Sequence, residues 1–345
     1  MPLQNWLRYH IKLSLAAVLF YSGALFVVLR WRLRRRALVL LYHRVLPATD
    51  SAQSFSSKAI IVSPATFERH LRFLQRHFSV LGPEEFRTWL SSGRDYPRPP
   101  CLITFDDGWK DNFTHARPAL KTRNLPAIIF LPTDYIGSGK AFWQERLSRL
   151  LFRLGQQPAL RAHPLVAQHG LAALFTLAGS ALADRASDQA RTFKNRSPHE
   201  AENFIAEVST ALAGYSDSSP DIDTYLSWED VHSMRADDIA FGSHTRSHRI
   251  LTQIDPPAVD IELSESKRIL EQRLNTSVHL LAYPNGNHNT DTCARARQAG
   301  YELAFTTVAG RVAQGDDPMT LRRINIHDGA HRHLPLFCAS ILGVL

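Results

Sequence analysis

Residues 102–113 read LITFDDGWKDNF and place two adjacent carboxylates at the end of an apolar run. The apolar residues 102–105 are typical of a buried strand, and Gly108 ends it. Bringing the like charges of Asp106 and Asp107 together costs free energy unless a cation or a shared proton compensates them. The stretch therefore predicts a buried strand that ends at a cation or at a shared proton.

Strands and helices alternate on both sides of this stretch. Continuous apolar runs, which are typical of strands buried on both faces, occur at residues 37–45 (ALVLLYHRV) and 126–132 (PAIIFLP). Residues 63–78 show helical spacing of apolar side chains, with Ser63 placed to cap the helix. This alternation predicts a parallel α/β fold, either an open doubly wound sheet or a barrel.

The alternation is interrupted between about residues 139 and 225 by Ala-, Leu- and Arg-rich segments with helical periodicity. We expect a helical insertion there, and we find no catalytic pattern in it. The alternation then resumes and continues to a last strand at residues 321–326 (LRRINI). The predicted organisation is a membrane anchor with a basic flank at residues 1–36, followed by one barrel at residues 37–345 that contains the insertion.

The net charge of +8 is concentrated at the amino terminus. Residues 1–36 contain seven Lys or Arg and no Asp or Glu, which leaves only +1 for the rest of the chain. A nearly neutral folded part argues against a nucleic-acid partner. Three scattered cysteines and the lack of a CxxC pair argue against a disulfide framework and a zinc knuckle.

An apolar stretch lies among these basic residues, at residues 13–29. It is at the short end of the length that spans a bilayer; the alternative is an amphipathic helix lying on the membrane, with Trp6, Tyr9, Tyr21 and Trp31 at the interface. A cleaved signal peptide is disfavoured because no small-residue cleavage site follows. The heavier positive charge follows the stretch, so the positive-inside rule predicts attachment to the inner, cytoplasmic membrane with the barrel on the cytoplasmic face.

A second candidate site segment is residues 242–248, GSHTRSH. His244 and His248 are four residues apart, and a helix starting after the preceding strand would place both imidazoles on one face. Two histidines and a carboxylate are a recurrent ligand set for a divalent metal that leaves a position open for water. The simpler alternative is a solvated helix face.

Parallel strands end on the same edge of a sheet or barrel, so the histidine pair and the aspartate pair are expected to meet. One aspartate would then bind the metal, and the other would take a proton from the water that the metal holds. Capping of the helix after Gly108 is the simpler alternative for either aspartate alone.

Two further strand ends offer catalytic groups. Residues 280–286 (LLAYPNG) end in a turn, and its backbone N–H groups near Tyr283 and Asn285 could stabilise an oxyanion. His43 ends the first strand and is the candidate general acid that protonates a leaving amine, with His327 as its competitor.

The motifs TFDDG, SHTRSH and AYPNG, in this order, resemble those of the NodB-homology polysaccharide deacetylases, carbohydrate esterase family 4. LLYHRV ahead of TFDDG is similar to the branch that includes the poly-N-acetylglucosamine deacetylases. The resemblance covers most of residues 37–325 apart from the insertion. It implies a distorted (β/α)7 barrel of NodB type and metal-dependent hydrolysis of an N-acetyl group on a sugar.

The resemblance also implies roles for individual residues. Asp106 matches the catalytic base, and His43 matches the histidine used as the acid in that branch. The positions that match metal ligands are Asp107, His244 and His248.

The third motif departs from the family pattern at two positions, and at one of them Asn285 stands where an aromatic residue usually precedes the glycine. The third motif usually begins with an arginine that contacts the base, and this chain has Ala282 there. We expect Arg322 or Arg323, from the last strand, to replace that arginine.

The predicted function is therefore a membrane-attached deacetylase that acts on a surface polysaccharide or on its lipid-linked precursor. One divalent metal is implied, with zinc expected and cobalt, nickel or manganese as alternatives. A non-catalytic glycan-binding barrel stays open as an alternative, as does a deformylase or O-acetyl esterase acting on a lipid-linked sugar. The second aspartate favours an enzyme, because a binding module needs no base beside a metal ligand.

Overall fold

The computed structural model describes residues 3–33, 35–195, 198–215 and 222–344. The chain forms two compact units. The first comprises Met1–Leu46, Ala59–Ser138 and Tyr225–Leu345, and the second comprises Pro47–Lys58 and Gly139–Thr224. Each unit has its own hydrophobic core, and the two are described separately.

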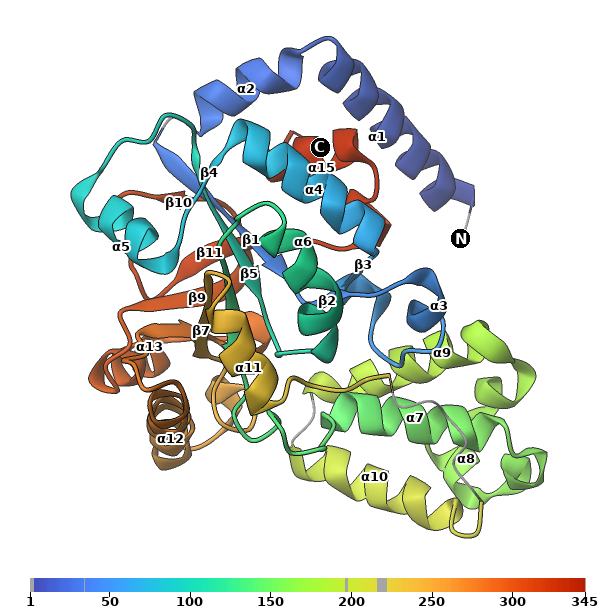
Figure 1. Ribbon diagram of the computed structural model, residues 1–345. Helices are drawn as coiled ribbons and strands as arrows, with labels where there is room; N and C mark the ends of the chain where they lie inside the picture. The colour runs from blue at the N-terminus through green and yellow to red at the C-terminus, as the bar shows by residue number, and fades with distance from the viewer. Residues whose placement is uncertain (1–2, 34, 196–197, 216–221, 345) are drawn as a thin grey trace. The chain divides into compact units, whose positions relative to one another are not determined.

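The first unit is built around a closed parallel barrel (Figure 1). Seven strands follow the order β1-β11-β9-β8-β7-β6-β5, and β5 pairs with β1 to close the ring. Each neighbouring pair in the ring is parallel. The strands are β1 Arg36–Tyr42, β5 Pro100–Phe105, β6 Ala127–Leu131, β7 Ile239–Ser243, β8 Leu280–Ala282, β9 Leu303–Ala309 and β11 Leu321–Asn325. The structure thus confirms the predicted (β/α)7 barrel and excludes the open sheet.

Short strands extend the ring at its margins. β10 (Val312–Ala313) pairs antiparallel with β1, and β4 (Ser79–Val80) pairs parallel with β5. β2 (Arg44–Val45) and β3 (Ile61–Val62) form a separate two-stranded sheet. None of these pairs interrupts the ring.

The barrel strands are continuous apolar runs because both of their faces are covered. All six residues of β5 are buried, as are all residues of β1 except Arg36. One face of each strand points into the barrel and the other packs under a helix, so alternation of polar and apolar residues is lost. Polar groups follow at the carboxyl ends of the strands.

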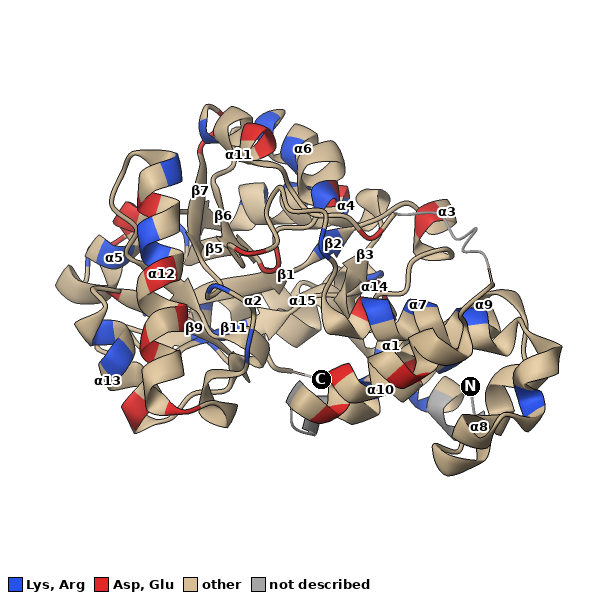
Figure 2. Ribbon diagram, turned by 90° about the horizontal axis from the view of Figure 1, so that it is seen from below, with Lys and Arg blue, Asp and Glu red and all other residues tan. Residues whose placement is uncertain are grey.

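Helices cover the outside of the barrel. They are α4 Pro64–His77, α5 Pro83–Ser92, α6 Arg117–Lys121, α11 Trp228–Arg235, α12 Pro256–Leu274, α13 Thr290–Gln298, α14 Asp328–His331 and α15 Leu334–Ile341. Ser63 caps α4 as predicted, since its side chain accepts the N–H of Thr66. A π-helical turn, Asn112–Ala116, precedes α6. Positive and negative side chains both occur along α12 (Figure 2), as expected for a solvated helix face.

Two helices precede the barrel, α1 (Leu3–Tyr21) and α2 (Ala24–Arg32). No single helix in the described part of the chain meets the length and hydropathy required to cross a bilayer. The pair Trp6–Tyr21 and Ala24–Arg32 meets them only when taken together, across a bend of 84°.

The second unit is helical. Its helices are α3 Ala48–Ser51, α7 Trp143–Gly155, α8 Pro164–Gln168, α9 Gly179–Arg191 and α10 Pro198–Ala211. Leu147, Leu151 and Val208 are among its fully buried apolar side chains. Asp223 ties its two chain segments together by accepting hydrogen bonds from Ser54 Oγ at 2.7 Å and from Phe55 N–H at 2.8 Å.

Candidate active site and metal centre

The predicted site residues gather where the parallel strands end. β1 and β5 run in register with Tyr42 opposite Phe105, so His43 and Asp106 each follow directly on a strand end. The N–H of Asp106 donates to the Tyr42 carbonyl at 3.0 Å. On the same rim, His244 follows β7. The barrel thus brings segments that are more than one hundred residues apart in the chain to one edge.

Three of the predicted ligands converge on one point. Oδ1 of Asp107 lies 3.5 Å from Nε2 of His244 and 3.3 Å from Nε2 of His248. The three potential ligand atoms all lie within 4.8 Å of one another. A carboxylate oxygen and two imidazole nitrogens at this separation could hold one divalent cation between them.

The conformation of Asp107 is set by its neighbours. Its backbone is left-handed, with φ of 74°, and Gly108 continues the turn with φ of 64°. A Cβ on Gly108 would lie 2.7 Å from Cδ2 of Leu131, so the turn needs glycine there. The indole N–H of Trp109 donates to Oδ2 of Asp107 at 3.0 Å, which leaves Oδ1 directed at the imidazoles.

The tautomer of His244 follows from its second ring nitrogen. Nδ1 lies 2.7 Å from the carbonyl oxygen of Ala282, to which it donates, and Nε2 therefore carries the free lone pair. His244 is buried, with 2% of its surface exposed. This fixed imidazole directs Nε2 at Asp107: when protonated, Nε2 donates to the carboxylate, and when neutral, it offers its lone pair to a cation held between the two side chains.

The expected helix through the histidine pair is absent, and this prediction is wrong. Gly242 is still within β7, and residues 244–250 form an irregular loop. Thr245 and His248 adopt left-handed backbone conformations, with φ of 63° and 59°. The two imidazoles meet because the loop turns back on itself, not because they share a helical face.

A buried carboxylate on α12 holds this loop. Glu262 accepts the backbone N–H of Arg246 at 2.9 Å and that of Ser247 at 2.8 Å, and it also accepts the Ser247 hydroxyl. Ser243 Oγ accepts the N–H of Thr245 at 3.0 Å. These side-chain hydrogen bonds replace the backbone hydrogen bonds that a helix would have supplied, and they fix the position of His248.

Asp106 is held differently from Asp107. Its two oxygens each accept a hydrogen bond of 2.7 Å from the Arg323 guanidinium, in a bidentate pair inside the barrel. Arg323 is fully buried and also donates to the Thr306 carbonyl and to Thr104 Oγ1. Of the two expected replacements for the family arginine, Arg323 contacts the carboxylate, whereas Arg322 is exposed.

The electrostatics of the rim favour ionised carboxylates. Burial acts to raise the pKa of Asp106, but Arg323 and His244 outweigh it, so this pKa lies below its usual value. Burial also acts to raise the pKa of Asp107, and the hydrogen bonds from His244 and His248 outweigh it by more. Burial acts to lower the pKa of His244, but Asp106 and Asp107 reverse this and raise it. Capping of a helix does not explain either aspartate.

His43 belongs to this site and His327 does not. Burial lowers the pKa of His43, and the charges that also act on it are those of Asp107, Asp106, Arg323 and His244. Its Nδ1 is buried and has no hydrogen-bond partner among the described residues. The ring of His327 instead lies 5.5 Å from that of His331, and the charge that acts on it is that of Asp328.

Of the two residues whose backbone N–H groups were predicted to stabilise an oxyanion, only Asn285 is still a candidate. The N–H of Tyr283 is taken by the Phe305 carbonyl at 3.0 Å, its ring is fully buried, and Pro284 has no N–H to offer. The amide of Tyr283 is therefore not free for an oxyanion, because it belongs to the sheet. Asn285 stays the candidate donor: it is exposed, in a left-handed conformation with φ of 57°.

Two residues that fix the site were not predicted from the sequence. Trp109 directly follows TFDDG, and its position was the only signal available for it. Its ring contacts the Arg44 guanidinium at 4.1 Å and the Tyr225 ring at 4.6 Å, which holds the indole in place. Glu262 lies in an ordinary helical pattern, with no local signal for its role.

Comparisons with known proteins also point to a deacetylase. A family model described as polysaccharide deacetylase matches residues 156–304, a range that includes both histidines and the AYPNG turn. The expected resemblance to the polysaccharide deacetylases is thereby confirmed, and the protein is a hydrolase of carbon–nitrogen bonds other than peptide bonds.

Individual relatives extend the match. YxkH of Bacillus subtilis, assigned by name to the polysaccharide deacetylases, is 20% identical over 292 residues, which are 84% of this chain and 71% of that protein. The poly-beta-1,6-N-acetyl-D-glucosamine N-deacetylase of Staphylococcus epidermidis is 32% identical over 113 residues. That match covers 30% of this chain and 39% of the staphylococcal enzyme.

Two solved structures share the fold. The Streptococcus pyogenes deacetylase PplD superposes with a TM-score of 0.57 at 20% identity, over 89% of this chain and 98% of that one. IcaB from Ammonifex degensii superposes with a TM-score of 0.57 at 19% identity, over 89% and 97% of the two chains. At this identity the likeness shows the fold alone.

Proposed function

We propose that this chain is a polysaccharide deacetylase that hydrolyses N-acetyl groups of a polysaccharide of N-acetylglucosamine, with a divalent metal, Asp106 and His43 at the barrel rim. One observation carries the proposal: Asp107, His244 and His248 converge on one point directly beside a second, separately held carboxylate. The similarity to a staphylococcal poly-N-acetylglucosamine deacetylase supports the choice of polymer. A lipid-linked precursor is the rival substrate.

The donor set fits a divalent cation. Asp107 Oδ1 and the Nε2 atoms of His244 and His248 are hard and borderline ligands of the kind that zinc, cobalt, nickel and manganese accept, and zinc is the metal we favour. Each ligand is oriented from behind, Asp107 by Trp109 and His244 by the Ala282 carbonyl. When bound, such a cation would polarise the acetamide carbonyl and lower the pKa of a water molecule beside it.

Asp106 serves as the base in this proposal. Its carboxylate lies 3.9 Å from Nε2 of His244, so it borders the ligand cluster without being one of its three closest donors. Because Arg323 keeps it ionised, it can accept a proton from the water that attacks the acetamide carbon. The same guanidinium fixes both carboxylate oxygens, which orients the carboxylate for that transfer.

His43 serves as the acid. Collapse of the tetrahedral adduct breaks the carbon–nitrogen bond, releases acetate and leaves an amine that needs a proton. His43 borders the two aspartates and keeps a buried Nδ1 without a hydrogen-bond partner among the described residues. Asn285 is the candidate donor to the developing oxyanion, through its backbone N–H.

The test uses the purified full chain with β-1,6-linked N-acetylglucosamine oligomers and, separately, with lipid-linked N-acetylated sugars. We expect equal amounts of acetate and free amine from the oligomers, with loss of activity in chelator and recovery on adding Zn²⁺. Asp106→Asn should lower kcat by about 10²–10⁴-fold while keeping the bound metal. Chelator-resistant activity would contradict the proposal, and binding of oligomers without turnover would favour a glycan-binding barrel. Release of formate or loss of O-acetyl groups would identify the other hydrolase activities instead.

A further inference from the structure

The two amino-terminal helices leave an unusual surface uncovered. Eleven large apolar side chains are exposed within the described residues, and eight of them lie on α1 and α2. Exposed apolar side chains concentrated in one region mark a contact surface, whereas single scattered ones do not. The eight, called the apolar stripe here, are Trp6, Leu7, Ile11, Leu15, Val18, Tyr21, Val27 and Trp31.

The opposite face of these helices is already used. α1 packs against α15, with Ala16 fully buried, and α2 packs through Leu25 and Leu29 (Figure 1). The Phe26 ring contacts the His77 ring on α4 at 4.9 Å. Since one face of each helix is fixed on the barrel unit, only the stripe is available for another partner.

The stripe has the spacing of a helix face. Leu7, Ile11, Leu15 and Val18 follow one another at intervals of four, four and three residues, so they lie along one side of α1. Trp6, Tyr21 and Trp31 add aromatic rings of the kind that prefer the boundary between lipid headgroups and acyl chains. This composition suits a helix that lies in a membrane interface.

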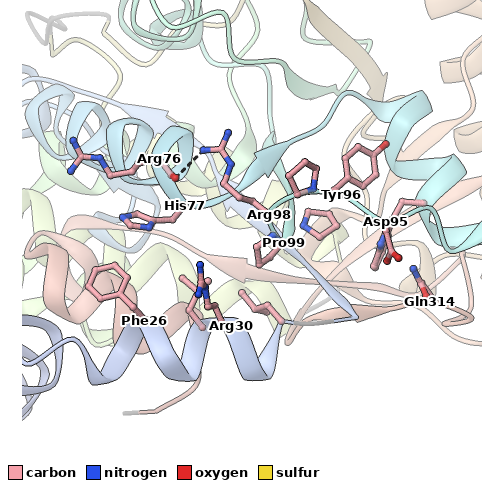
Figure 3. A pocket seen from close by; sticks show the side chains of 14 residues that line it. Phe26, Arg30, Arg76, His77, Asp95, Tyr96, Arg98, Pro99 and Gln314 are labelled. Atoms are coloured by element: carbon pink, nitrogen blue, oxygen red, sulfur yellow. Dashed lines mark hydrogen bonds between the residues drawn. The ribbon is translucent and has the colours of Figure 1, made fainter.

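A basic pocket opens beside the stripe. It has a volume of about 490 Å³ and lies between α2, the end of α4 and the loop before β5 (Figure 3). Arg30, Arg76 and Arg98 line it, and none of the three forms an ion pair in the described part of the chain. Asp95 is the only acidic residue among the lining residues.

The Arg98 side chain is anchored by hydrogen bonds, whereas the Arg30 and Arg76 side chains make none within the described part of the chain. The Arg98 guanidinium donates to the carbonyl oxygens of Gln75 at 2.7 Å and Arg76 at 2.8 Å, at the end of α4. In Figure 3 the side chain of Arg30 rises from α2 towards this group. Uncompensated guanidinium groups around one pocket are suited to an anionic phosphate.

We propose that the apolar stripe docks on an anionic lipid bilayer and that the pocket lined by Arg30, Arg76 and Arg98 takes the phosphate of a lipid headgroup. Charge decides between lipid and a second copy of the chain as the occupant. Residues 1–36 carry seven positive charges and no negative one, so two copies would repel across this surface, whereas an anionic bilayer attracts it. The protein lies on the membrane surface in this arrangement and does not cross the bilayer.

The experiment is co-sedimentation of the full chain with vesicles of phosphatidylcholine alone or with about one third phosphatidylglycerol. We expect stronger binding to the anionic vesicles, with a dependence on salt. The double variant V18D/V27D should lower partitioning to both kinds of vesicle by about tenfold or more, because two exposed valines that would enter the lipid become charged. I261D changes another exposed apolar residue, on α12, and is the matched control, expected to bind like the unaltered chain.

Variants of the pocket arginines separate the contribution of the pocket to vesicle binding from that of the apolar stripe. R30Q/R76Q should bind neutral vesicles unchanged and lose most of the preference for anionic vesicles, whereas R268Q, at an exposed arginine on α12, should keep it. Inorganic phosphate at millimolar concentration should not release the protein, since the stripe still holds it; release would show a free phosphate site instead. Bound protein should be extracted by alkaline carbonate, and resistance would indicate a spanning segment and overturn the proposal.

Two other outcomes would also overturn it: equal binding by V18D/V27D and the unaltered chain, or no binding to any vesicle by a folded chain that forms dimers through this face. Dimers would be recognised by gel filtration, with V18D/V27D running as the monomer. Deacetylase activity is not needed for any of these readouts.

Discussion

The barrel unit contains two pairs of histidines spaced four residues apart, and they behave in opposite ways. His244 and His248 lie beside Asp107, and the neighbouring carboxylates raise the pKa of His244 despite its burial. His327 and His331 also lie near one another, but among the described residues no single carboxylate contacts both of their rings. Burial lowers the pKa of His331 to about 4. Spacing alone therefore does not distinguish a candidate metal site; the buried carboxylate beside the rings does.

The second pair belongs to a neutral polar network. Nε2 of His70 lies 2.9 Å from the His331 carbonyl, its Nδ1 lies 3.1 Å from the Tyr42 hydroxyl, and its ring stacks on Phe337 at 3.9 Å. Burial lowers the pKa of His70 to about 3. These histidines act as uncharged hydrogen-bonding groups in the packing around α15.

The largest expected effect comes from removing the Arg323 guanidinium, whose positive charge compensates the Asp106 carboxylate. In Arg323→Met the carboxylate stays buried without its partner, and breaking a buried pair from one side costs about 3–5 kcal/mol. The free energy of unfolding, measured with urea in chelator, should fall by that amount. Loss of the charge at Asp106 in the double variant R323M/D106N should restore part of it.

Arg322→Met is the matched control for this substitution. Arg322 precedes Arg323 on the same strand but is exposed, so we expect its free energy of unfolding to change by about 0.5 kcal/mol or less. Equal effects of the two substitutions would show that the contact with Asp106 does not matter for stability.

A smaller effect is expected from loosening the loop that carries His248. Glu262→Ala removes the acceptor of two backbone N–H groups, so His248 loses its fixed position and affinity for Zn²⁺ should fall by about 10–100-fold. Glu262→Gln keeps an acceptor oxygen and should recover most of the affinity. Glu265→Ala, one turn further along α12 and paired with Arg268, should bind Zn²⁺ normally; an equal loss there would point to a general effect on the helix.

The smallest expected effect concerns pH and the neutral histidines. Below about pH 6.5 the unfolded chain protonates His70 and His331, whereas the folded chain does not until about pH 3 and about pH 4. Stability is therefore lost as the pH falls through this window, at about 1.4 kcal/mol per pH unit for each histidine.

Urea unfolding of His70→Gln at several pH values between 6 and 4.5 tests this. The slope of stability against pH should decrease by about 1.4 kcal/mol per pH unit, which is the contribution of one histidine. An unchanged slope in His70→Gln would mean that His70 is protonated in the folded protein.

The strands and the paired aspartates could be predicted because their signals are local. A continuous apolar run followed by two carboxylates predicted β5 and its rim, and the repeated alternation predicted a parallel fold. The closure of the sheet into a barrel was predicted only from the family resemblance, because the local sequence patterns did not exclude an open sheet. The prediction that the barrel sits on the cytoplasmic face of the inner membrane stays a prediction.

The support of the histidine loop could not be predicted because it is non-local: Glu262 reaches the loop from a separate helix. Arg323 reaches Asp106 from a strand more than two hundred residues away, and it was one of two candidates only because the family resemblance left an arginine missing at Ala282. The helix expected at His244 failed because left-handed backbone at Thr245 and His248 is stabilised by those tertiary hydrogen bonds, which spacing does not reveal.

Metal binding tests the central claim most directly. Metal content and Zn²⁺ titration of the unaltered chain, His244→Ala and His327→Ala should give about one, none and about one high-affinity ion per chain. The account would be contradicted if His244→Ala bound Zn²⁺ as tightly as the unaltered chain, or if His327→Ala lost the ion instead.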